Sequence, residues 1–287
     1  MTPTGAQHTA LAGRAVVVTG AGGGLGESYA RAVVAHGGSV VVNDVDADRA
    51  ASVARSLGVR AVAHPADISD WAAAGALVER CVTEFGAIDG LVNNAGVLAL
   101  SWPHEQSEAD ARRLVDVNLF GAIACGTHAL RHMVARGRGA VVNVTSGEQA
   151  GNSASAVYGA TKAAVAALTA SWAQDVAAHG VRVNAVSPNA QTAMAEVNAA
   201  FRGTDTRNDG LTPEVNAPLV VYLLSDRAHV TGQVLRLHGD ELMLMSRPAV
   251  LEPVARCPEW TVASVEDAVD GPLRSVRQPF GLRRVPS

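Results

Sequence analysis

Short apolar runs rich in β-branched residues alternate with longer stretches of helical composition along most of the chain. The first such run, residues 14–19, has the length and composition of a buried parallel strand, and a helical stretch follows it. Parallel strands need crossover connections, which are right-handed and place helices against the sheet. The alternation therefore predicts an α/β fold with a single Rossmann-type, doubly wound parallel sheet and helices on both faces. We expect about seven strands, at residues 14–19, 39–43, 59–64, 88–92, 140–145, 181–186 and 233–237.

The helical stretches set the expected limits of the domain. We expect helices at residues 27–35, 47–57, 71–85, 108–135, 156–178 and 213–224. One domain would then cover residues 11–240, after a flexible N-terminal arm at residues 1–10. Prolines interrupt residues 241–287, so we interpret this part as an appended tail that packs on a neighbouring surface, for example another subunit.

Composition and charge exclude several functional classes. The net charge is -4 and the pI is about 6.1, so the chain has no basic footprint for nucleic acid. No apolar run reaches the ~18 residues that a membrane span needs, and the first ten residues lack the apolar core of a secretory signal. The three cysteines are widely spaced and suit reduced thiols rather than metal ligands. We therefore expect a cytoplasmic protein with no nucleic acid, membrane or metal partner.

A glycine-rich turn connects the first expected strand to the first expected helix. Glycines there allow a tight turn and let a pyrophosphate approach backbone N–H groups at the helix N-terminus. Flexible loops can have a similar composition, but the position between strand and helix favours a nucleotide site. The candidate cofactor contacts in this turn are Gly20, Gly24, Leu25 and Gly26.

Asp44 ends the second expected strand, where a carboxylate can accept hydrogen bonds from the adenosine ribose. The same carboxylate would repel a 2′-phosphate, and neither the glycine turn nor residues 43–46 offer an arginine to bind one. We therefore expect the cofactor to be NAD rather than NADP. The alternative interpretation of Asp44 is a cap for the helix that follows.

Tyr158 and Lys162 form a pair four residues apart, which a helix places on one face about one turn apart. Lys162 is the only lysine of the 287-residue chain, whereas all other long basic side chains are arginines. A neighbouring cation favours the phenolate of a tyrosine, so the pair could exchange a proton with an alcohol oxygen. The alternative is an ordinary surface pair.

Several separated motifs, taken in order, resemble the classical short-chain dehydrogenases/reductases over residues 11–240. Besides the glycine turn, they are Asp67-Ile68, the segment Asn93-Asn94-Ala95-Gly96, Val117-Asn118-Leu119, Ser146, the Tyr158/Lys162 pair and Pro188-Asn189. The resemblance implies the Rossmann-type fold and adds cofactor contacts at Asp67, Ile68, Asn94, Ala95, Gly96, Tyr158, Lys162, Pro188 and Asn189.

The resemblance also implies a catalytic tetrad. Tyr158 would be the general acid/base, and Lys162 would lower its pKa and hold the nicotinamide ribose. Ser146 would hydrogen-bond the reacting oxygen, and Asn118 would hold a water in a proton relay to Lys162. Without the resemblance, Asn118 could be a helix-interior amide and Ser146 a residue that forms a turn.

Two positions depart from the family pattern. Ser146 lies one residue closer to Tyr158 than usual, as if residues 147–150 had lost one residue, and Thr145 stands at the usual spacing as a substitute hydroxyl. The usual glycine after Pro188 is replaced by Asn189, which tolerates left-handed backbone better than most residues.

Softer motifs near residues 41–44, 188–194 and 212–223 are similar to the (3R)-hydroxyacyl-CoA dehydrogenase modules of peroxisomal multifunctional enzymes and their bacterial relatives. That branch implies a 3-hydroxyacyl thioester or a hydroxysteroid as substrate, with Arg202 and Arg207 as candidates for the CoA phosphates. An unrelated sugar or terpene alcohol is an alternative, as is a dinucleotide-binding sensor or scaffold without catalysis. Family members commonly assemble, so we expect a homotetramer or homodimer.

Residues 189–211 are the expected substrate lid, and residues 97–102 are the other expected wall. Apolar residues at helical spacing would turn one face of the lid toward the nicotinamide. A loosely ordered surface loop is the alternative, since the second half of this segment is polar and rich in breakers. The residues of the expected apolar face are Met194, Val197 and Phe201.

Overall fold

The computed structural model describes residues 9–203, 211–278 and 281–284, and it contains one eight-stranded sheet in the order β3-β2-β1-β4-β5-β6-β7-β8. Seven strands are parallel, and β8 pairs with β7 in the antiparallel sense. The expected parallel α/β sheet is therefore confirmed. The strands are β1 (Ala15–Val18), β2 (Ser39–Val42), β3 (Ala61–Ala63), β4 (Gly90–Asn93), β5 (Gly139–Val144), β6 (Val181–Pro188), β7 (Val234–His238) and β8 (Glu241–Leu244).

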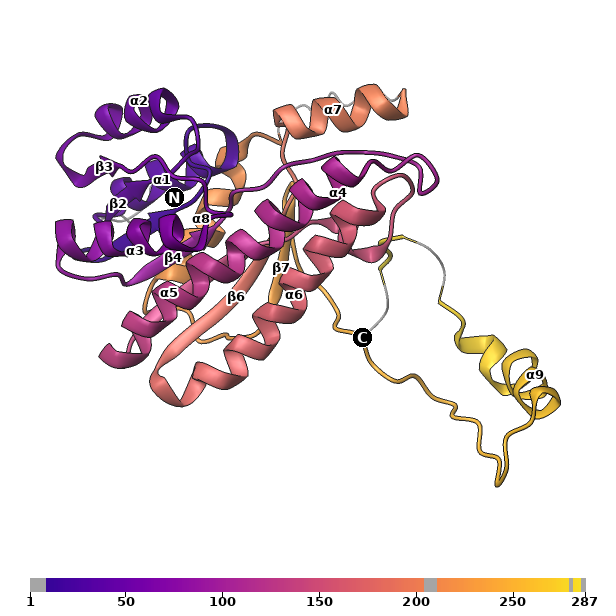
Figure 1. Ribbon diagram of the computed structural model, residues 1–287. Helices are drawn as coiled ribbons and strands as arrows, with labels where there is room; N and C mark the ends of the chain where they lie inside the picture. Colours follow the sequence, from indigo (N-terminus) through magenta and orange to yellow (C-terminus); the bar gives the residue numbers. More distant parts are fainter. Residues whose placement is uncertain (1–8, 204–210, 279–280, 285–287) are drawn as a thin grey trace.

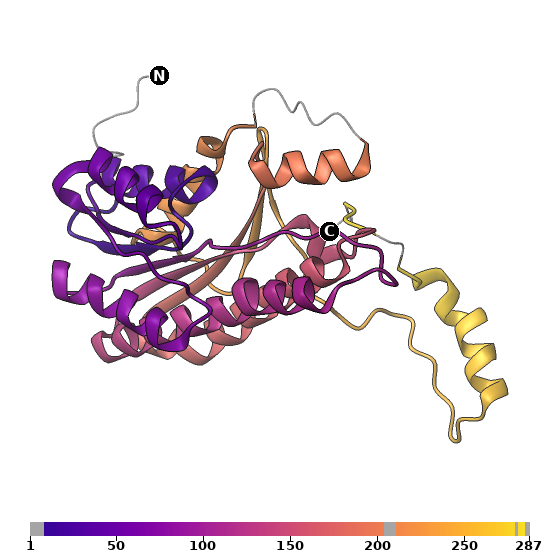
Figure 2. The ribbon, with the colours of Figure 1, turned by 45° about the horizontal axis from the view of Figure 1, so that its top comes forward.

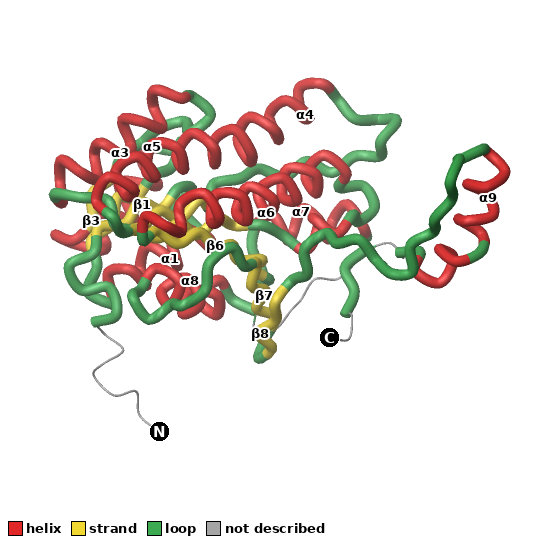
Figure 3. The backbone as a smooth tube through the Cα atoms, turned by 90° about the horizontal axis from the view of Figure 1, so that it is seen from below, coloured by secondary structure: helices red, strands yellow, loops and turns green. Residues whose placement is uncertain are grey.

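Helices cover both faces of this sheet (Figures 1 and 3). The α-helices are α1 (Gly24–Ala35), α2 (Ala47–Leu57), α3 (Trp71–Phe85), α4 (Glu108–Val115), α5 (Gly121–Arg136), α6 (Ala156–Val176), α7 (Ala193–Arg202), α8 (Ala217–Leu224) and α9 (Val262–Asp270). Short 3₁₀ turns lie at Gly58–Arg60, Gly147–Ala150, Ala177–His179, Pro213–Asn216 and Pro272–Val276.

Strand β1 shows how the alternation of side chains builds two cores. Val16 and Val18 pack with residues of α1, α2 and α8, whereas Val17 points to the other face and packs with residues of α3, α5 and α6. All three valines are fully buried, and full burial of such a side chain is worth roughly 1.5–3 kcal/mol. A parallel sheet covered on both faces thus explains the continuous apolar run that the sequence shows.

The expected long helix at residues 108–135 is interrupted, and this expectation is wrong. A π-helical turn, Asp116–Phe120, separates α4 from α5. Asn118 lies in this turn, is 2% exposed and is hydrogen-bonded to the backbone of Val97. Such turns are frequent at functional sites, since the wider turn re-aims a side chain.

The sheet also continues past residue 240, because β8 extends it after a turn at Gly239-Asp240. The chain then leaves the body of the molecule, carries α9 and returns toward the sheet (Figures 1 and 2). Several apolar side chains of this excursion are exposed: Val250, Leu251, Trp260, Val262, Val265 and Val269. Packing of this tail on another subunit stays a prediction. No helix among the described residues is both long and apolar enough to cross a membrane.

Candidate active site

The glycine turn between β1 and α1 is shaped so that two of its glycines are required. Gly20 has φ +61°, and a Cβ there would lie 2.8 Å from the Cα of Ala95. A Cβ on Gly26 would lie 2.1 Å from the carbonyl oxygen of Gly20. Asn94 fixes this turn, since its Nδ2 donates to the carbonyl oxygens of Thr19 and Gly20 at 2.9 and 3.1 Å.

The same turn is open on its outer side. A Cβ on Gly23 or Gly24 would meet nothing within 4 Å, and α1 begins at Gly24 with the free N–H groups of a helix N-terminus. Gly20 and Gly26 are closely packed, whereas the backbone at Gly23 and Gly24 is open. This arrangement fits the pyrophosphate of a dinucleotide.

Asp44 lies beside this turn at the end of β2. Its Oδ2 accepts a hydrogen bond from the Gly22 N–H at 3.0 Å, and its Oδ1 accepts one from the Asp46 N–H at 3.1 Å. The capping role is taken by Asp46, which accepts from the N–H groups of Asp48 and Arg49 at the start of α2. Asp44 is thus placed at the glycine turn.

Arg49 was not expected near the cofactor turn. A Cβ on Gly22 would lie 2.8 Å from both the Arg49 Cβ and the Asp44 Oδ2, so these two residues flank the turn. The arginine belongs to α2 and reaches this place only because the helix folds back over the end of β2.

The strand ends beyond β2 also meet here. The Ala66 N–H donates to the Asp44 carbonyl oxygen at 3.2 Å, which brings the end of β3 next to that of β2. The Asp67 carboxylate accepts from the N–H and hydroxyl of Ser69, and Ile68 is buried against Gly121. Asp67 and Ile68 therefore lie at the same edge of the sheet as the glycine turn.

Asn118 is held by both ends of its amide. Its Oδ1 accepts from the Val97 N–H at 2.7 Å, and its Nδ2 donates to the Val97 carbonyl at 3.0 Å and to the Thr161 hydroxyl at 3.3 Å. A Cβ on Gly96 would lie 3.2 Å from the Asn118 Oδ1 and 3.5 Å from the Lys162 Nζ. The π-helical turn of Asn118 and the helix of Lys162 thus both place a polar atom next to Gly96.

Lys162 and Tyr158 lie on α6, as the spacing predicts. Lys162 is 4% exposed, its Nζ donates to the Val144 carbonyl at 2.9 Å, and it lies 5.8 Å from the centre of the Tyr158 ring. Burial lowers the pKa of Lys162 to about 8. Burial also raises the pKa of Tyr158; the Ser146 hydroxyl acts in the opposite direction, and the Glu148 carboxylate raises it further.

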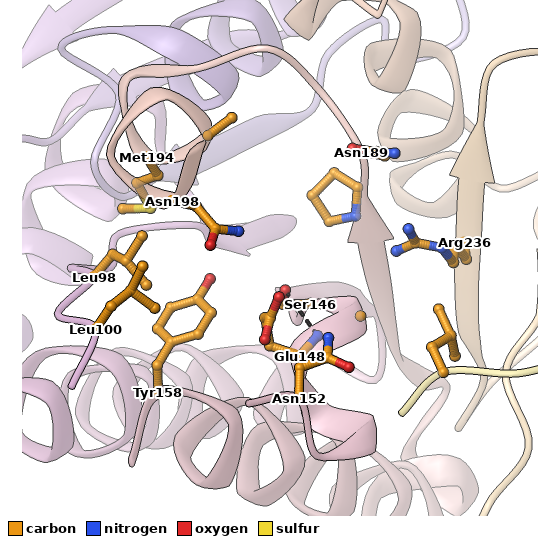
Figure 4. A pocket seen from close by; sticks show the side chains of 14 residues that line it. Leu98, Leu100, Ser146, Glu148, Asn152, Tyr158, Asn189, Met194, Asn198 and Arg236 are labelled. Atoms are coloured by element: carbon orange, nitrogen blue, oxygen red, sulfur yellow. Dashed lines mark hydrogen bonds between the residues drawn. The ribbon is translucent and has the colours of Figure 1, made fainter. Parts of the chain in front are cut away.

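The two candidate hydroxyls at the end of β5 have different surroundings. The Thr145 hydroxyl donates to the Val186 carbonyl at 3.1 Å, and the residue is 2% exposed, so this hydroxyl belongs to the sheet. Ser146 lines a cavity together with Tyr158 (Figure 4). The geometry therefore favours Ser146 despite its shorter spacing.

Pro188 ends β6 at the same cavity, followed by Asn189. Asn189 does not use the left-handed backbone that asparagine tolerates, because in the described part of the chain Ala154 is the only non-glycine residue with positive φ. The Asn189 carbonyl instead accepts from the Asn216 side chain at 3.2 Å. Replacement of the usual glycine therefore causes no strain.

The cavity has a volume of about 240 Å³. Helix α7 and the segment after β4 supply most of its apolar wall, and the 3₁₀ turn after Ser146 supplies polar groups (Figure 4). The tail returns to it through Leu282. The lining residues outside the expected tetrad are Leu98, Leu100, Gly147, Glu148, Asn152, Pro188, Asn189, Met194, Ala195, Asn198, Arg236 and Leu282.

A family model described as short chain dehydrogenase matches residues 14–202. The chain belongs to the short-chain dehydrogenase family. It is 42% identical over 241 residues to cis-4-hydroxycyclohexanecarboxylate dehydrogenase of Sinomonas cyclohexanicum, an alignment that covers 80% of this chain and 97% of the relative.

Two solved structures share the fold of this short-chain dehydrogenase. A short chain dehydrogenase from Mycobacterium avium has a TM-score of 0.84 and 32% identity, covering 95% of this chain and 99% of that one. A gluconate 5-dehydrogenase from Burkholderia cenocepacia, in complex with NADP and tartrate, has a TM-score of 0.74 and 30% identity, covering 81% and 96%. The protein is thus an oxidoreductase of the short-chain dehydrogenase type that acts on alcohols.

Several residues that line the cavity of this dehydrogenase belong to none of the sequence motifs. Glu148, Asn152 and Asn198 sit in loop or lid positions, and Arg236 occupies a strand position that the sequence marks only as part of a short apolar run. A charged residue inside an otherwise apolar run was the one available signal for Arg236.

Proposed function

We propose that this short-chain dehydrogenase interconverts a secondary alcohol and a ketone with NAD, and that Tyr158 is its general acid/base. The observation that carries the proposal is the common cavity of Tyr158 and Ser146, with the buried Lys162 next to the tyrosine ring. A sensor or scaffold has no need for a desolvated phenol, hydroxyl and ammonium around one cavity.

Each side chain has a role that its surroundings support. The Ser146 hydroxyl donates to the reacting oxygen, and Tyr158 takes the alcohol proton during oxidation or returns it during ketone reduction. The Lys162 ammonium lies 5.8 Å from the centre of the Tyr158 ring, and a neighbouring positive charge stabilises the phenolate. Asn118 fixes the backbone at Gly96 and Val97 beside Lys162; the proposed water relay stays a prediction.

The nicotinamide dinucleotide, when bound, supplies the hydride acceptor or donor. The glycine turn would hold its pyrophosphate and Asp44 its adenosine ribose. The residues proposed to bind it are Gly20, Gly24, Leu25, Gly26, Asp44, Asp67, Ile68, Asn94, Ala95, Gly96, Tyr158, Lys162, Pro188 and Asn189.

We expect Asp44→Ala to change the cofactor preference. Loss of the carboxylate removes hydrogen-bond acceptors for the ribose, worth about 1.5–3 kcal/mol, so kcat/KM for NAD⁺ should fall about tenfold or more. The kcat/KM for NADP⁺ should increase, because the repulsion of its 2′-phosphate disappears while Arg49 stays beside the turn. Steady-state kinetics with both cofactors measure the ratio. Asp46→Ala, which removes a neighbouring carboxylate that caps α2, should leave this ratio near wild type; an unchanged ratio in Asp44→Ala contradicts the NAD assignment.

The rate of alcohol oxidation should increase with pH. Tyr158 must be ionised to accept the proton, and burial and Glu148 raise its pKa above the ordinary value, so the ionised fraction grows from neutral pH upward. Above about pH 8 Lys162 loses its charge and favours the phenolate less, so the rise should flatten there. Ketone reduction needs the protonated phenol, so its rate should not increase with pH. Rates of both directions between about pH 6 and 9 test this; pH-independent oxidation would contradict it.

The cavity favours a small alcohol over a CoA thioester. Arg202, one candidate for the CoA phosphates, already donates to the Asn198 amide at 2.6 Å and to the Ser153 carbonyl at 2.8 Å. The other candidate, Arg207, lies outside the described residues. Two of the proteins described above are named for hydroxycyclohexanecarboxylate and gluconate, alcohols that also carry a carboxylate, whereas other relatives are named for L-fucose and for a hydroxysteroid. We therefore propose that the substrate is a small hydroxylated ring or polyol rather than a hydroxysteroid or thioester. The hydroxyacyl-CoA branch stays a prediction.

A substrate panel tests this function. Purified protein with NAD⁺ is given a hydroxycyclohexanecarboxylate, a 3-hydroxyacyl-CoA and a hydroxysteroid, and formation of reduced dinucleotide is followed by absorbance. We expect turnover of the ring alcohol above the other two. NAD⁺ binding with no turnover of any alcohol would favour the sensor or scaffold instead.

A further inference from the structure

Arg236 brings a guanidinium into the catalytic cavity. It lies on β7 opposite Ser187 of β6, and its Nη1 donates to the Ser187 hydroxyl at 2.9 Å. It is half-buried, and a Cβ on Gly147, the residue after Ser146, would lie 3.1 Å from this Nη1. Figure 4 shows Arg236 and Tyr158 on opposite sides of the cavity, with Ser146 between them.

No carboxylate of the described residues pairs with Arg236. The cavity's own acid, Glu148, has other partners, since its Oε2 accepts from the Ser155 hydroxyl and lies 3.9 Å from the Arg202 Nη2. Burial lowers the pKa of Arg236, with no opposing contribution from an acidic neighbour. Among the described residues, the Arg236 charge is therefore left without a counter-charge.

A half-buried cation without a counter-charge costs free energy, unless a ligand supplies the anion. The planar guanidinium offers a fork of N–H donors that matches a carboxylate in two parallel hydrogen bonds. Leu282 from the returning tail lies next to Gly147 and lines the cavity near this fork, so water is partly excluded there. Leu98, Leu100 and Met194 supply apolar wall on the side of Tyr158.

We propose that Arg236 binds a carboxylate carried by the substrate, so that the substrate class is a small secondary alcohol or ketone with a carboxylate on the side of the molecule remote from the reacting carbon. This inference rests on the proposed function, since it takes the reacting oxygen to lie at Ser146 and Tyr158. The distance between the two ends of the cavity then selects the separation of hydroxyl and carboxylate, and the apolar wall selects the carbon frame between them.

Two matched substrates test the proposal: a hydroxycyclohexane ring with a carboxylate, and the same ring with a neutral carboxamide. With NAD⁺, wild type should prefer the carboxylate by roughly 100-fold in kcat/KM. Arg236→Met should raise KM for the carboxylate by about that factor, with kcat and the carboxamide rates within about threefold of wild type. Arg236→Lys should restore part of the preference, because an ammonium keeps the charge but not the fork. Arg55→Met, which removes an exposed arginine on α2, should keep the wild-type preference.

Equal losses for both substrates in Arg236→Met, or a higher KM for NAD⁺, would overturn the proposal and assign Arg236 to the fold or the cofactor. Equal wild-type rates for both substrates would refute it while the proposed function stands. If neither substrate is oxidised, the proposed function fails for this ring, and calorimetric titration with the two compounds still decides the inference. Carboxylate binding that is lost in Arg236→Met supports it, and equal binding of both compounds refutes it.

Discussion

Tyr158→Phe is expected to lower kcat/KM for alcohol oxidation by about 10³-fold, since general acid–base catalysis contributes about 10²–10⁴-fold. The substitution removes one hydroxyl from the cavity and leaves the aromatic ring next to Lys162. In the proposed binding mode the glycine turn and Asp44 hold most of the cofactor, so the Kd for NAD⁺ should stay within a few-fold of wild type. Steady-state kinetics and fluorescence titration with the dinucleotide measure the two quantities.

A second tyrosine offers the matched control. Tyr222 lies on α8 and is 38% exposed, and it does not line the cavity. Tyr222→Phe should keep the wild-type rate. An active Tyr158→Phe enzyme would show that another group moves the proton, and the proposed role of Tyr158 would have to be withdrawn.

Lys162→Met is expected to cause a loss of similar size, about 10³-fold in kcat/KM. Without the ammonium the Tyr158 phenolate loses its nearest stabilising charge, so oxidation should also start to rise at a higher pH than in wild type. The variant should fold, because replacing a buried charge with an apolar side chain is often neutral for stability. The pH dependence of the rate and the thermal unfolding midpoint are the measurements.

Lys162→Arg distinguishes charge from shape at this position. The Nζ lies against Val144 and Gly96 in a place that is 4% exposed, which leaves little room for a planar guanidinium. We therefore expect this variant to remain well below wild type although it keeps the charge. Wild-type activity in both variants would mean that the only lysine of the chain has no catalytic task.

The fold could be predicted from local sequence patterns alone, without knowledge of the tertiary contacts. The seven expected strand segments overlap the seven parallel strands, and the expected boundaries of α2 and α3 match those of the structure. The relation of Tyr158 to Lys162 was also predictable, because helical spacing alone fixes it.

The interruption at Asn118 could not be predicted in the same way. No proline interrupts residues 108–135, and the contacts of Asn118 in the π-helical turn are with residues distant in sequence, Val97 and Thr161. Arg49, Arg236 and Leu282 also reach the site through contacts between elements far apart in sequence. Arg49 and Leu282 carry no local signal, and the one local signal for Arg236 is its place within an apolar run.

The shortened segment after Ser146 has a local explanation in the structure. Gly147–Ala150 forms a single 3₁₀ turn, and the Ser146 hydroxyl accepts from the Glu148 N–H at 3.2 Å. The missing residue is thereby accommodated before α6 begins, and Ser146 still lines the cavity beside Tyr158. The sequence showed the deletion but not the compact turn that accommodates it.

Transfer of deuterium from the alcohol carbon to the dinucleotide tests directly whether the protein catalyses hydride transfer. The ring alcohol deuterated at its carbinol carbon is incubated with NAD⁺ and the enzyme, and the reduced dinucleotide is analysed by mass spectrometry. We expect the reduced dinucleotide to carry the deuterium, a ketone to form in equal amount, and Tyr158→Phe to form both far more slowly. Reduced dinucleotide without deuterium, or none with any deuterated alcohol of the panel, would contradict it.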